Sequence, residues 1–138
     1  MKNSVLIIEK DPQVLDTIKA MVEIAGNQAI DVCTTDAALT ALSKRRFDVV
    51  MTSSMHASTL KMISLPWLVK QVQPTAAVVL TAAGQPVERT AASSIDTFLT
   101  KPFSIAGIRR AIAGLPLSQP HPQLTPQTAV RMSVAAYA

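Results

Sequence analysis

Polar and charged residues follow four apolar stretches of this 138-residue sequence, and their types suit chemistry at the end of a sheet. In chain order they are Glu9, Lys10 and Asp11, then Ser53, then Thr81, and finally Lys101. Open α/β sheets bind ligands beyond the carboxyl ends of their strands, so these side chains are candidates for one site. A carboxylate can bind magnesium, whereas a serine hydroxyl is a weak nucleophile unless a base takes its proton.

Five apolar stretches predict the β-strands that would position these residues. The stretch 5–8 is continuously apolar and rich in β-branched residues, which is typical of a strand buried on both faces. The other predicted strands are 29–33, which suits the edge of a sheet, 49–51, 76–80 and 96–99.

Apolar residues at helical spacing separate these strands. Residues 12–25 carry one apolar stripe, with Pro12 in the first turn and Gly26 just beyond the end. Further helices are predicted from about Thr35 as N-cap, over 67–72, over 86–93, and after Ser104 as N-cap to about Leu115. Five strands alternating with five helices predict an α/β fold with a parallel sheet and helices on both faces.

Residues 1–115 form the predicted domain, and residues 116–138 a Pro-rich linker and C-terminal tail. Segment 116–127 contains four prolines and little to bury, which indicates an extended linker. No apolar stretch approaches the roughly 18 residues that a membrane span requires. The first residues also lack the features of a secretory signal. We therefore expect a cytoplasmic protein that does not contact a membrane.

The positive charge of the chain lies in its second half. Residues 1–60 contain six Lys/Arg and seven Asp/Glu, a net of −1, whereas residues 61–138 contain seven and two, a net of +5. Basic surfaces can bind nucleic acid, but the sequence has no basic run interleaved with aromatic residues and no recognised DNA-binding motif. A protein partner with an acidic surface is the simpler expectation.

Four motifs together resemble the receiver domains of response regulators, the CheY-like phosphoacceptor modules of two-component systems. They are VLIIEKDP, DVVMTSSM, VVLTAAG and DTFLTKPF, and the resemblance spans about residues 3–115. It implies a flavodoxin-like fold with strand order 2-1-3-4-5. It also implies phosphorelay signal transduction, in which an aspartate after the third strand accepts a phosphoryl group with the help of magnesium.

Some of the residues that this resemblance would require are retained. Thr81 and Lys101 match the Ser/Thr and the lysine that contact the phosphoryl group. Phe98 matches an aromatic residue that changes rotamer on activation.

Two other positions depart from the pattern. The acidic pair after the first strand reads Glu9 and Lys10, and Ser53 stands where the acceptor aspartate is expected. Because magnesium prefers carboxylate oxygens, we expect the metal site to be lost and no cofactor to bind. Serine cannot form the acyl phosphate that an aspartate forms. The sequence therefore predicts a pseudo-receiver, which is not an enzyme and does not accept phosphoryl at Ser53.

Three residues leave alternatives open. Asp11 could replace a lost ligand, although the following proline makes it a natural N-cap, which we favour. His56 could serve Ser53 as a base or accept phosphoryl itself, although a solvated loop histidine is the simpler interpretation. Lys10 could fill the place of the metal beside Glu9 or point to solvent. The alternative functions are thus a receiver that uses Asp11 or His56, and a basic nucleic-acid-binding regulator.

Segment 85–113 is the surface through which the resemblance implies partner binding. It carries Arg89, Arg109 and Arg110, which could equally form an ordinary solvated face. We expect it to bind another signalling protein or a second copy of the chain as a homodimer.

Overall fold

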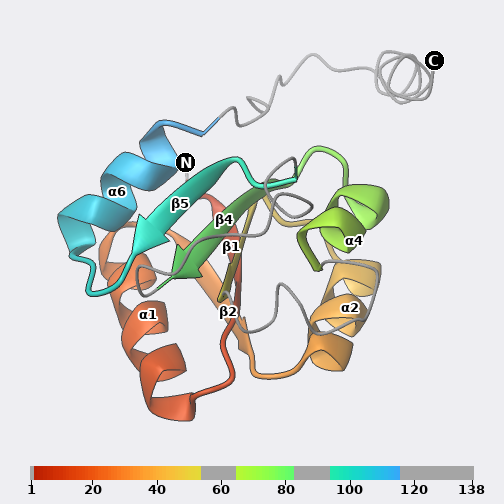
Figure 1. The fold of residues 1–138 in the computed structure, drawn as a ribbon, viewed down its shortest axis with the longest axis horizontal. Coiled ribbons are helices and arrows are strands. Elements are labelled where there is room, and N and C mark those ends of the chain that lie inside the picture. Colours follow the sequence, from red (N-terminus) through yellow and green to blue (C-terminus); the bar gives the residue numbers. More distant parts are fainter. Residues whose placement is uncertain (1, 54–64, 83–93, 116–138) are drawn as a thin grey trace.

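The computed structural model describes residues 2–53, 65–82 and 94–115, which form one parallel sheet with helices on both sides (Figure 1). The elements are β1 (Ser4–Ile8), α1 (Pro12–Ile24), β2 (Gln28–Val32), α2 (Thr35–Lys44), β3 (Val49–Ser53), α4 (Leu65–Val72), β4 (Ala77–Ala82), β5 (Thr97–Thr100) and α6 (Ile105–Ala113). The strand order is β2-β1-β3-β4-β5, and every neighbouring pair is parallel. The predicted α/β fold and strand order are confirmed. Four of the five predicted helices are described; the one predicted over 86–93 lies outside the described residues.

Two apolar cores lie on opposite faces of this sheet. Val5 and Ile7 of β1 pack with α1 and α6, whereas Leu6 and Ile8 pack with α2 and α4. Figure 1 shows the same division, with α1 and α6 on one side of the strands and α2 and α4 on the other. Because successive side chains of a strand point to opposite faces, β1 to β4 contribute to both cores, whereas β5 contributes Leu99 to the α1/α6 core. This alternation decides on which side a polar residue at a strand end must lie.

Side-chain caps fix the starts of three helices. The Asp11 carboxylate begins α1 by accepting the backbone N–H groups of Gln13 and Val14. Ser104 caps α6 as predicted. The cap of α2 is Thr34 and not Thr35, because the extended backbone of Thr34 lets its hydroxyl accept the third amide of the helix. Gly26 after α1 has φ 97°, a conformation that favours glycine.

β3 and β4 each run two residues further at their carboxyl ends than the sequence predicted. β3 continues to Ser53 and β4 to Ala82. The polar residues at these ends remain in the ladder, with Ser53 opposite Thr81. The prediction ended each strand where its apolar residues end, but backbone pairing does not require an apolar side chain.

Gln73, which follows α4, ties together the elements at the amino ends of the strands. Its side-chain oxygen accepts the N–H of Phe47, and its amide nitrogen donates to the carbonyls of Leu42 and Arg45 at 2.9 and 2.6 Å. The side chain is buried, with 9% of its surface exposed. Its polar atoms therefore all have partners, as buried polar groups require.

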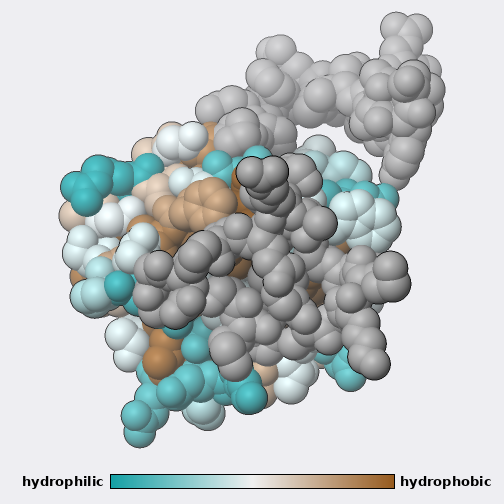
Figure 2. Space-filling view, in the orientation of Figure 1, coloured by the Kyte–Doolittle hydropathy of each residue, from teal (hydrophilic) through white to brown (hydrophobic). Residues whose placement is uncertain are grey.

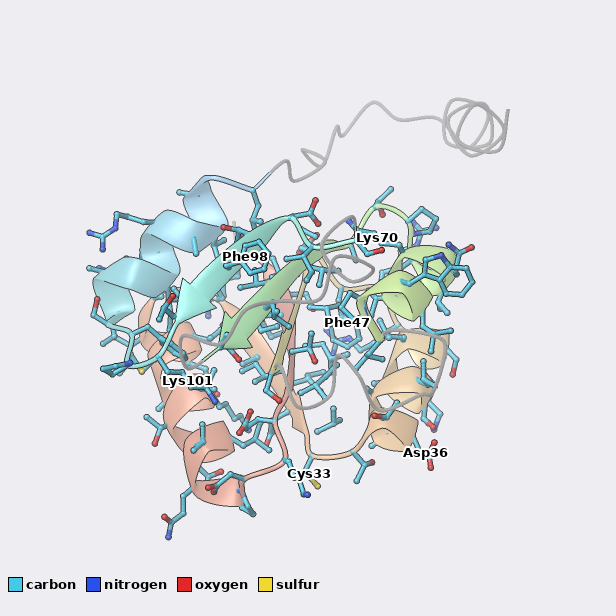
Figure 3. The ribbon with its side chains drawn as sticks, in the orientation of Figure 1. Cys33, Asp36, Phe47, Lys70, Phe98 and Lys101 are labelled. Carbon is cyan, nitrogen blue, oxygen red and sulfur yellow. The ribbon has the colours of Figure 1, made fainter. Side chains whose placement is uncertain are left out.

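A second polar link at the same end joins α4 to β5. Lys70 Nζ donates to the carbonyl of Ala76 and to the carboxylate of Asp96, both at 2.7 Å. That carboxylate oxygen also accepts the N–H of Val78 at 2.7 Å. Figure 3 places Lys70 far from Lys101, which marks the carboxyl end of the same strands.

The described part of the chain ends inside the core. Leu115 is buried with α6 against the sheet, and the predicted linker and tail, 116–138, lie outside the described residues. Among the helices of ranges 2–53, 65–82 and 94–115, none has both the length and the apolar character needed to cross a membrane.

Candidate functional site

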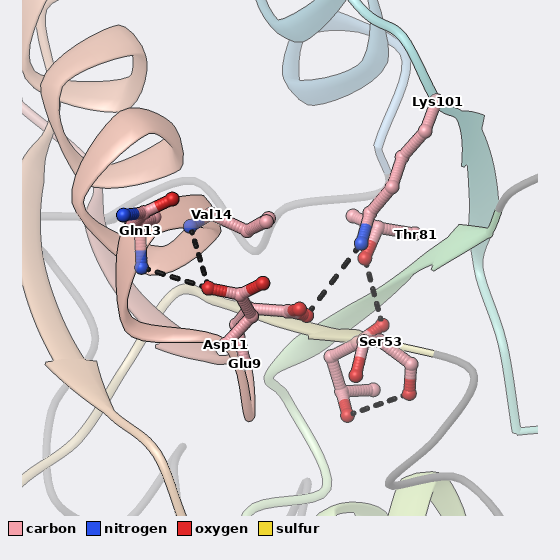
Figure 4. Close-up of polar contacts among 8 residues, drawn as sticks. Glu9, Asp11, Gln13, Val14, Ser53, Thr81 and Lys101 are labelled. Atoms are coloured by element: carbon pink, nitrogen blue, oxygen red, sulfur yellow. Dashed lines mark hydrogen bonds and ion pairs between the residues drawn. The ribbon is translucent and has the colours of Figure 1, made fainter.

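Four polar side chains meet on the α1/α6 side at the carboxyl ends of the strands; we call them the Ser53 cluster. Each lies two positions after a strand residue whose side chain belongs to the core under α1 and α6. Backbone hydrogen bonds from Glu9 N to Val32 and from Lys101 N to Ala82 continue the ladders beyond β1 and β5. Side-chain alternation therefore carries all four to one side of the sheet. The members of the cluster are Glu9, Ser53, Thr81 and Lys101 (Figure 4).

Glu9 and Lys101 form the ion pair of this cluster. Lys101 Nζ lies 3.6 Å from Glu9 Oε2, too far for a good hydrogen bond. The Glu9 side chain is nearly enclosed, with 8% exposed, and Oε2 has no hydrogen-bond partner among the described residues. A buried carboxylate without a nearby cation is costly. Lys101 thus supplies the positive charge that stabilises Glu9.

Ser53 lies beside this ion pair with its hydroxyl unused. Its exposed fraction is 3%, and Oγ has no hydrogen-bond partner within the part of the chain that the structure describes. A base that activates a serine must accept a hydrogen bond from its hydroxyl. No described residue does so, and His56 lies outside the described residues.

The hydroxyl of Thr81 is directed to the backbone of the neighbouring strand. Thr81 Oγ1 donates to the carbonyl of Thr52 at 3.5 Å, a long hydrogen bond. Thr81 is 2% exposed and stands opposite Ser53 in the β3–β4 ladder. Thr81, which matches the residue that contacts a phosphoryl group in receivers, therefore hydrogen-bonds to the backbone of β3.

Asp11 and Lys10 do not join the Ser53 cluster. One oxygen of Asp11 accepts two amides of α1, so the preferred N-cap role is confirmed (Figure 4). Lys10 is exposed, and the ion-pair partner that Glu9 has among described residues is Lys101. The geometry therefore offers no support for Lys10 as a substitute for the metal. Neighbouring residues of an extended chain point to opposite sides, which separates Lys10 from Glu9.

The cluster does not fit the magnesium ion that the receiver resemblance implies. Magnesium prefers several oxygen ligands in an octahedral arrangement, including one or more carboxylates. Glu9 is the one carboxylate of the cluster and already faces a lysine, while Asp11 caps a helix. Ranges 2–53, 65–82 and 94–115 contain no group of three His, Cys, Asp or Glu residues able to hold a metal. We therefore assign no chemical step to a metal here.

The retained aromatic residue, Phe98, lies at the surface of β5. It is 49% exposed. Figure 2 shows an apolar patch on this face over β5, where Figure 3 labels Phe98. Phe98 thus points away from the Ser53 cluster, because Leu99 and Lys101 alternate to the other side.

The arginines of the predicted partner surface have different environments. Arg110 is exposed, but Arg109 donates to the carbonyl of Ile24 at the end of α1, 3.2 Å away. Arg109 therefore connects α6 to α1, a contact across 85 residues that local sequence cannot reveal. Arg89 lies outside the described residues.

Sequence reasoning also missed the Glu9–Lys101 pair. It left open whether Lys10 lies beside Glu9 or points to solvent, although a usable signal for Lys101 existed. Both residues directly follow a predicted strand, and the parity of each strand places them on one side of the sheet.

The structure matches solved receiver domains over most of their length. One is a CheY-like response-regulator receiver domain from Methylobacillus flagellatus, with 27% identity, TM-score 0.68, and coverage of 82% of this chain and 98% of that one. A Francisella response-regulator receiver domain shows 24% identity and TM-score 0.68, covering 81% and 94%. The receiver domain of the Pseudomonas aeruginosa sensor histidine kinase PA1611, which has magnesium coordinated in its active-site cleft, shows 17% identity and TM-score 0.67, covering 80% and 93%.

No protein-family model and no curated protein sequence matches the chain. The structural matches agree with the strand order, the parallel pairing and the helices on both faces. The chain therefore has the CheY-like fold of response-regulator receiver domains.

Proposed function

We propose that this chain is a receiver domain of two-component signalling that does not accept phosphoryl at Ser53 and acts by binding another protein. The observation that carries the proposal is the Glu9–Lys101 ion pair. Glu9 is the one carboxylate of the Ser53 cluster, and Lys101 already lies beside it. Phosphoryl transfer of this kind depends on metal and lysine charges that together neutralise the phosphoryl oxygens.

The state of Ser53 supports the same conclusion. A serine hydroxyl needs a base, and no described residue accepts its hydrogen bond. The Thr81 hydroxyl, which would contact a bound phosphoryl group, bonds to the Thr52 carbonyl instead. Together these features describe a fixed polar cluster with no acceptor for the group that other receivers take.

Without phosphorylation, the domain would act by binding another protein. The half-exposed Phe98 and the exposed Arg110 belong to segment 85–113, which we propose binds another signalling protein or a second copy of the chain. Aromatic residues and arginines are enriched in protein interfaces, so both suit such a surface.

Phosphorylation with a small donor tests the proposal. The wild-type chain should show no added phosphoryl mass with acetyl phosphate and magnesium. The double variant K10D/S53D restores both missing carboxylates on the same scaffold, and we expect it to bind magnesium and take one phosphoryl group. A stoichiometric phosphorylated wild-type form would overturn the proposal.

The residue that carries any phosphoryl label distinguishes the alternative phosphoacceptors. Label on wild-type protein at Asp11 or His56, located by peptide mass spectrometry, would identify a receiver with a substitute acceptor. An Asp11→Asn variant provides a control, because it should leave the absence of label unchanged. Salt-sensitive binding to DNA would instead support the nucleic-acid alternative.

A further inference from the structure

A basic depression lies at the amino ends of the strands, at the opposite end of the sheet from the Ser53 cluster. It is open to solvent, has a volume of about 250 Å³ and is bounded by the ends of α2 and α4. These two helices lie side by side on one face of the sheet (Figure 1). Three consecutive cations contribute to its lining: Lys44, Arg45 and Arg46.

Cations at this end of a helix usually have an ordinary role, since they interact with its last carbonyl groups. Here Gln73 occupies two of those carbonyls, because its amide donates to Leu42 and Arg45. The Arg45 guanidinium donates to Ser4 Oγ instead. None of the three cationic side chains donates to a carbonyl at this end of α2 within the described residues, so they do not serve as its caps.

Two of the three cations have no partner in the described structure. Lys44 and Arg46 are exposed and make no ion pair or hydrogen bond to residues in 2–53, 65–82 or 94–115. The acid nearest to them in the chain, Asp48, accepts the N–H of Ser4 at 2.7 Å. The depression thus presents two cationic side chains that have no ion-pair partner among the described residues.

The third cation is held in place. Arg45 donates to Ser4 Oγ at 3.1 Å, and its guanidinium lies 5.1 Å from the centre of the Phe47 ring. These contacts reduce the side-chain freedom that Arg45 would lose on binding a ligand. An ordered arginine between two free cations is suited to a carboxylate, since guanidinium groups bind carboxylates through paired hydrogen bonds.

An apolar residue completes the depression. Val72, the last residue of α4, lines it and is 46% exposed. Charged residues around an exposed apolar side chain are typical of a protein interface. A nucleic acid instead requires cations along an extended strand, because its affinity comes from many phosphate contacts. One small depression with an apolar wall favours an acidic protein segment.

We propose that the α2/α4 depression binds an acidic segment of a partner protein that also carries an apolar side chain. Carboxylates of the partner would pair with Arg45 and with the flanking Lys44 and Arg46, and its apolar side chain would cover Val72. This inference rests on the proposed function of partner binding and adds a surface remote from segment 85–113.

A titration of the full chain with a short peptide of glutamate and leucine tests the proposal. The same peptide with glutamine in place of glutamate is the charge control. We expect NMR amide shifts to concentrate at 42–46 and 72–73. The variant K44Q/R46Q should bind roughly tenfold more weakly, because two exposed charge pairs are lost.

The double variant K10Q/K19Q removes the same charge from positions that do not line the depression and should bind the peptide as the wild type does. Shifts concentrated in 97–113, or equal affinity of K44Q/R46Q and wild type, would overturn the proposal. So would a short DNA duplex that binds the depression more tightly than the peptide does. These results leave the phosphorylation test of the proposed function unaffected, so the two failures can be distinguished.

Discussion

The two ends of the sheet treat buried polar groups in opposite ways. At the amino end, the buried Gln73 satisfies its amide fully, and the partly exposed carboxylate of Asp96 accepts both a lysine and a backbone amide. At the carboxyl end, Glu9 Oε2 and Ser53 Oγ are buried without hydrogen-bond partners among the described residues. At the amino end, polar groups therefore connect elements of the fold. At the carboxyl end, two buried polar atoms make no such hydrogen bond to a described residue.

This difference separates polar residues that stabilise the fold from polar residues of the candidate site. Buried polar groups normally have partners because an unpaired one raises the free energy of the folded state. The unpaired atoms here gather where a parallel sheet binds its ligands, which marks this end as the candidate functional site. Substitutions at the two ends should therefore differ in their cost.

The largest effect is expected for Gln73→Ala. The variant would leave the N–H of Phe47 and the carbonyls of Leu42 and Arg45 without this partner. We expect the free energy of unfolding to fall by about 3 kcal/mol. Urea denaturation measures it, and Gln71→Ala, exposed on the preceding helix α4, should change it by less than about 0.5 kcal/mol. Equal losses in the two variants would remove the contrast between the ends of the sheet.

A smaller loss is expected for Lys101→Met, which leaves the buried Glu9 carboxylate without its cation. A double-mutant cycle with Glu9→Gln should give a coupling energy of about 1 kcal/mol, with E9Q/K101M more stable than K101M alone. Thermal unfolding of the four proteins gives the coupling. Additive effects would show that Lys101 does not stabilise Glu9.

Ser53→Ala should have little effect on stability. Its hydroxyl makes no hydrogen bond to a described residue, so its removal breaks none of those contacts. We expect the free energy of unfolding to change by less than about 0.5 kcal/mol, in either direction. Chemical denaturation of both proteins measures the difference. A loss comparable to that of Gln73→Ala would show that Ser53 has a structural partner.

The smallest effect concerns an exposed ion pair, which serves as a reference for the buried one. Lys19 Nζ lies 3.2 Å from Asp31, whose hydrogen bond and charge raise the pKa of Lys19 above its ordinary value of 10.5. A raised folded-state pKa stabilises the fold below 10.5, and this contribution disappears as the pH rises through the folded value. NMR titration of Lys19 should show a lower pKa in Asp31→Asn; an unchanged pKa would assign the shift to other groups.

Local patterns were sufficient to predict the sheet and its helices. The continuous apolar stretch of β1 and the stripe of α1 are properties of adjacent residues, and both formed the expected elements. The limits of β3 and β4 were wrong, since the ladder extends into polar residues that hydropathy excludes. Thr34 and Thr35 have the same side chain, so only backbone conformation could assign the cap.

The location of the candidate site could be predicted from the sequence more easily than the contacts between its residues. Strand ends placed Glu9, Ser53, Thr81 and Lys101 at one edge. The possible pairing of Glu9 with Lys10 relied on adjacency in the sequence and was left open. The contact between Arg109 and Ile24 depends on how two distant helices pack. Such tertiary contacts have no signal within a short window of sequence.

The Glu9–Lys101 pair has a consequence for how such a domain could carry information. A receiver whose counter-ion is dissolved changes with the supply of that ion and of phosphate donors. Under the proposed function the counter-ion is Lys101, which is covalently part of the polypeptide and always present in a ratio of one to one. A regulator built in this way would respond to the amount of protein that the cell makes and to the partners it meets.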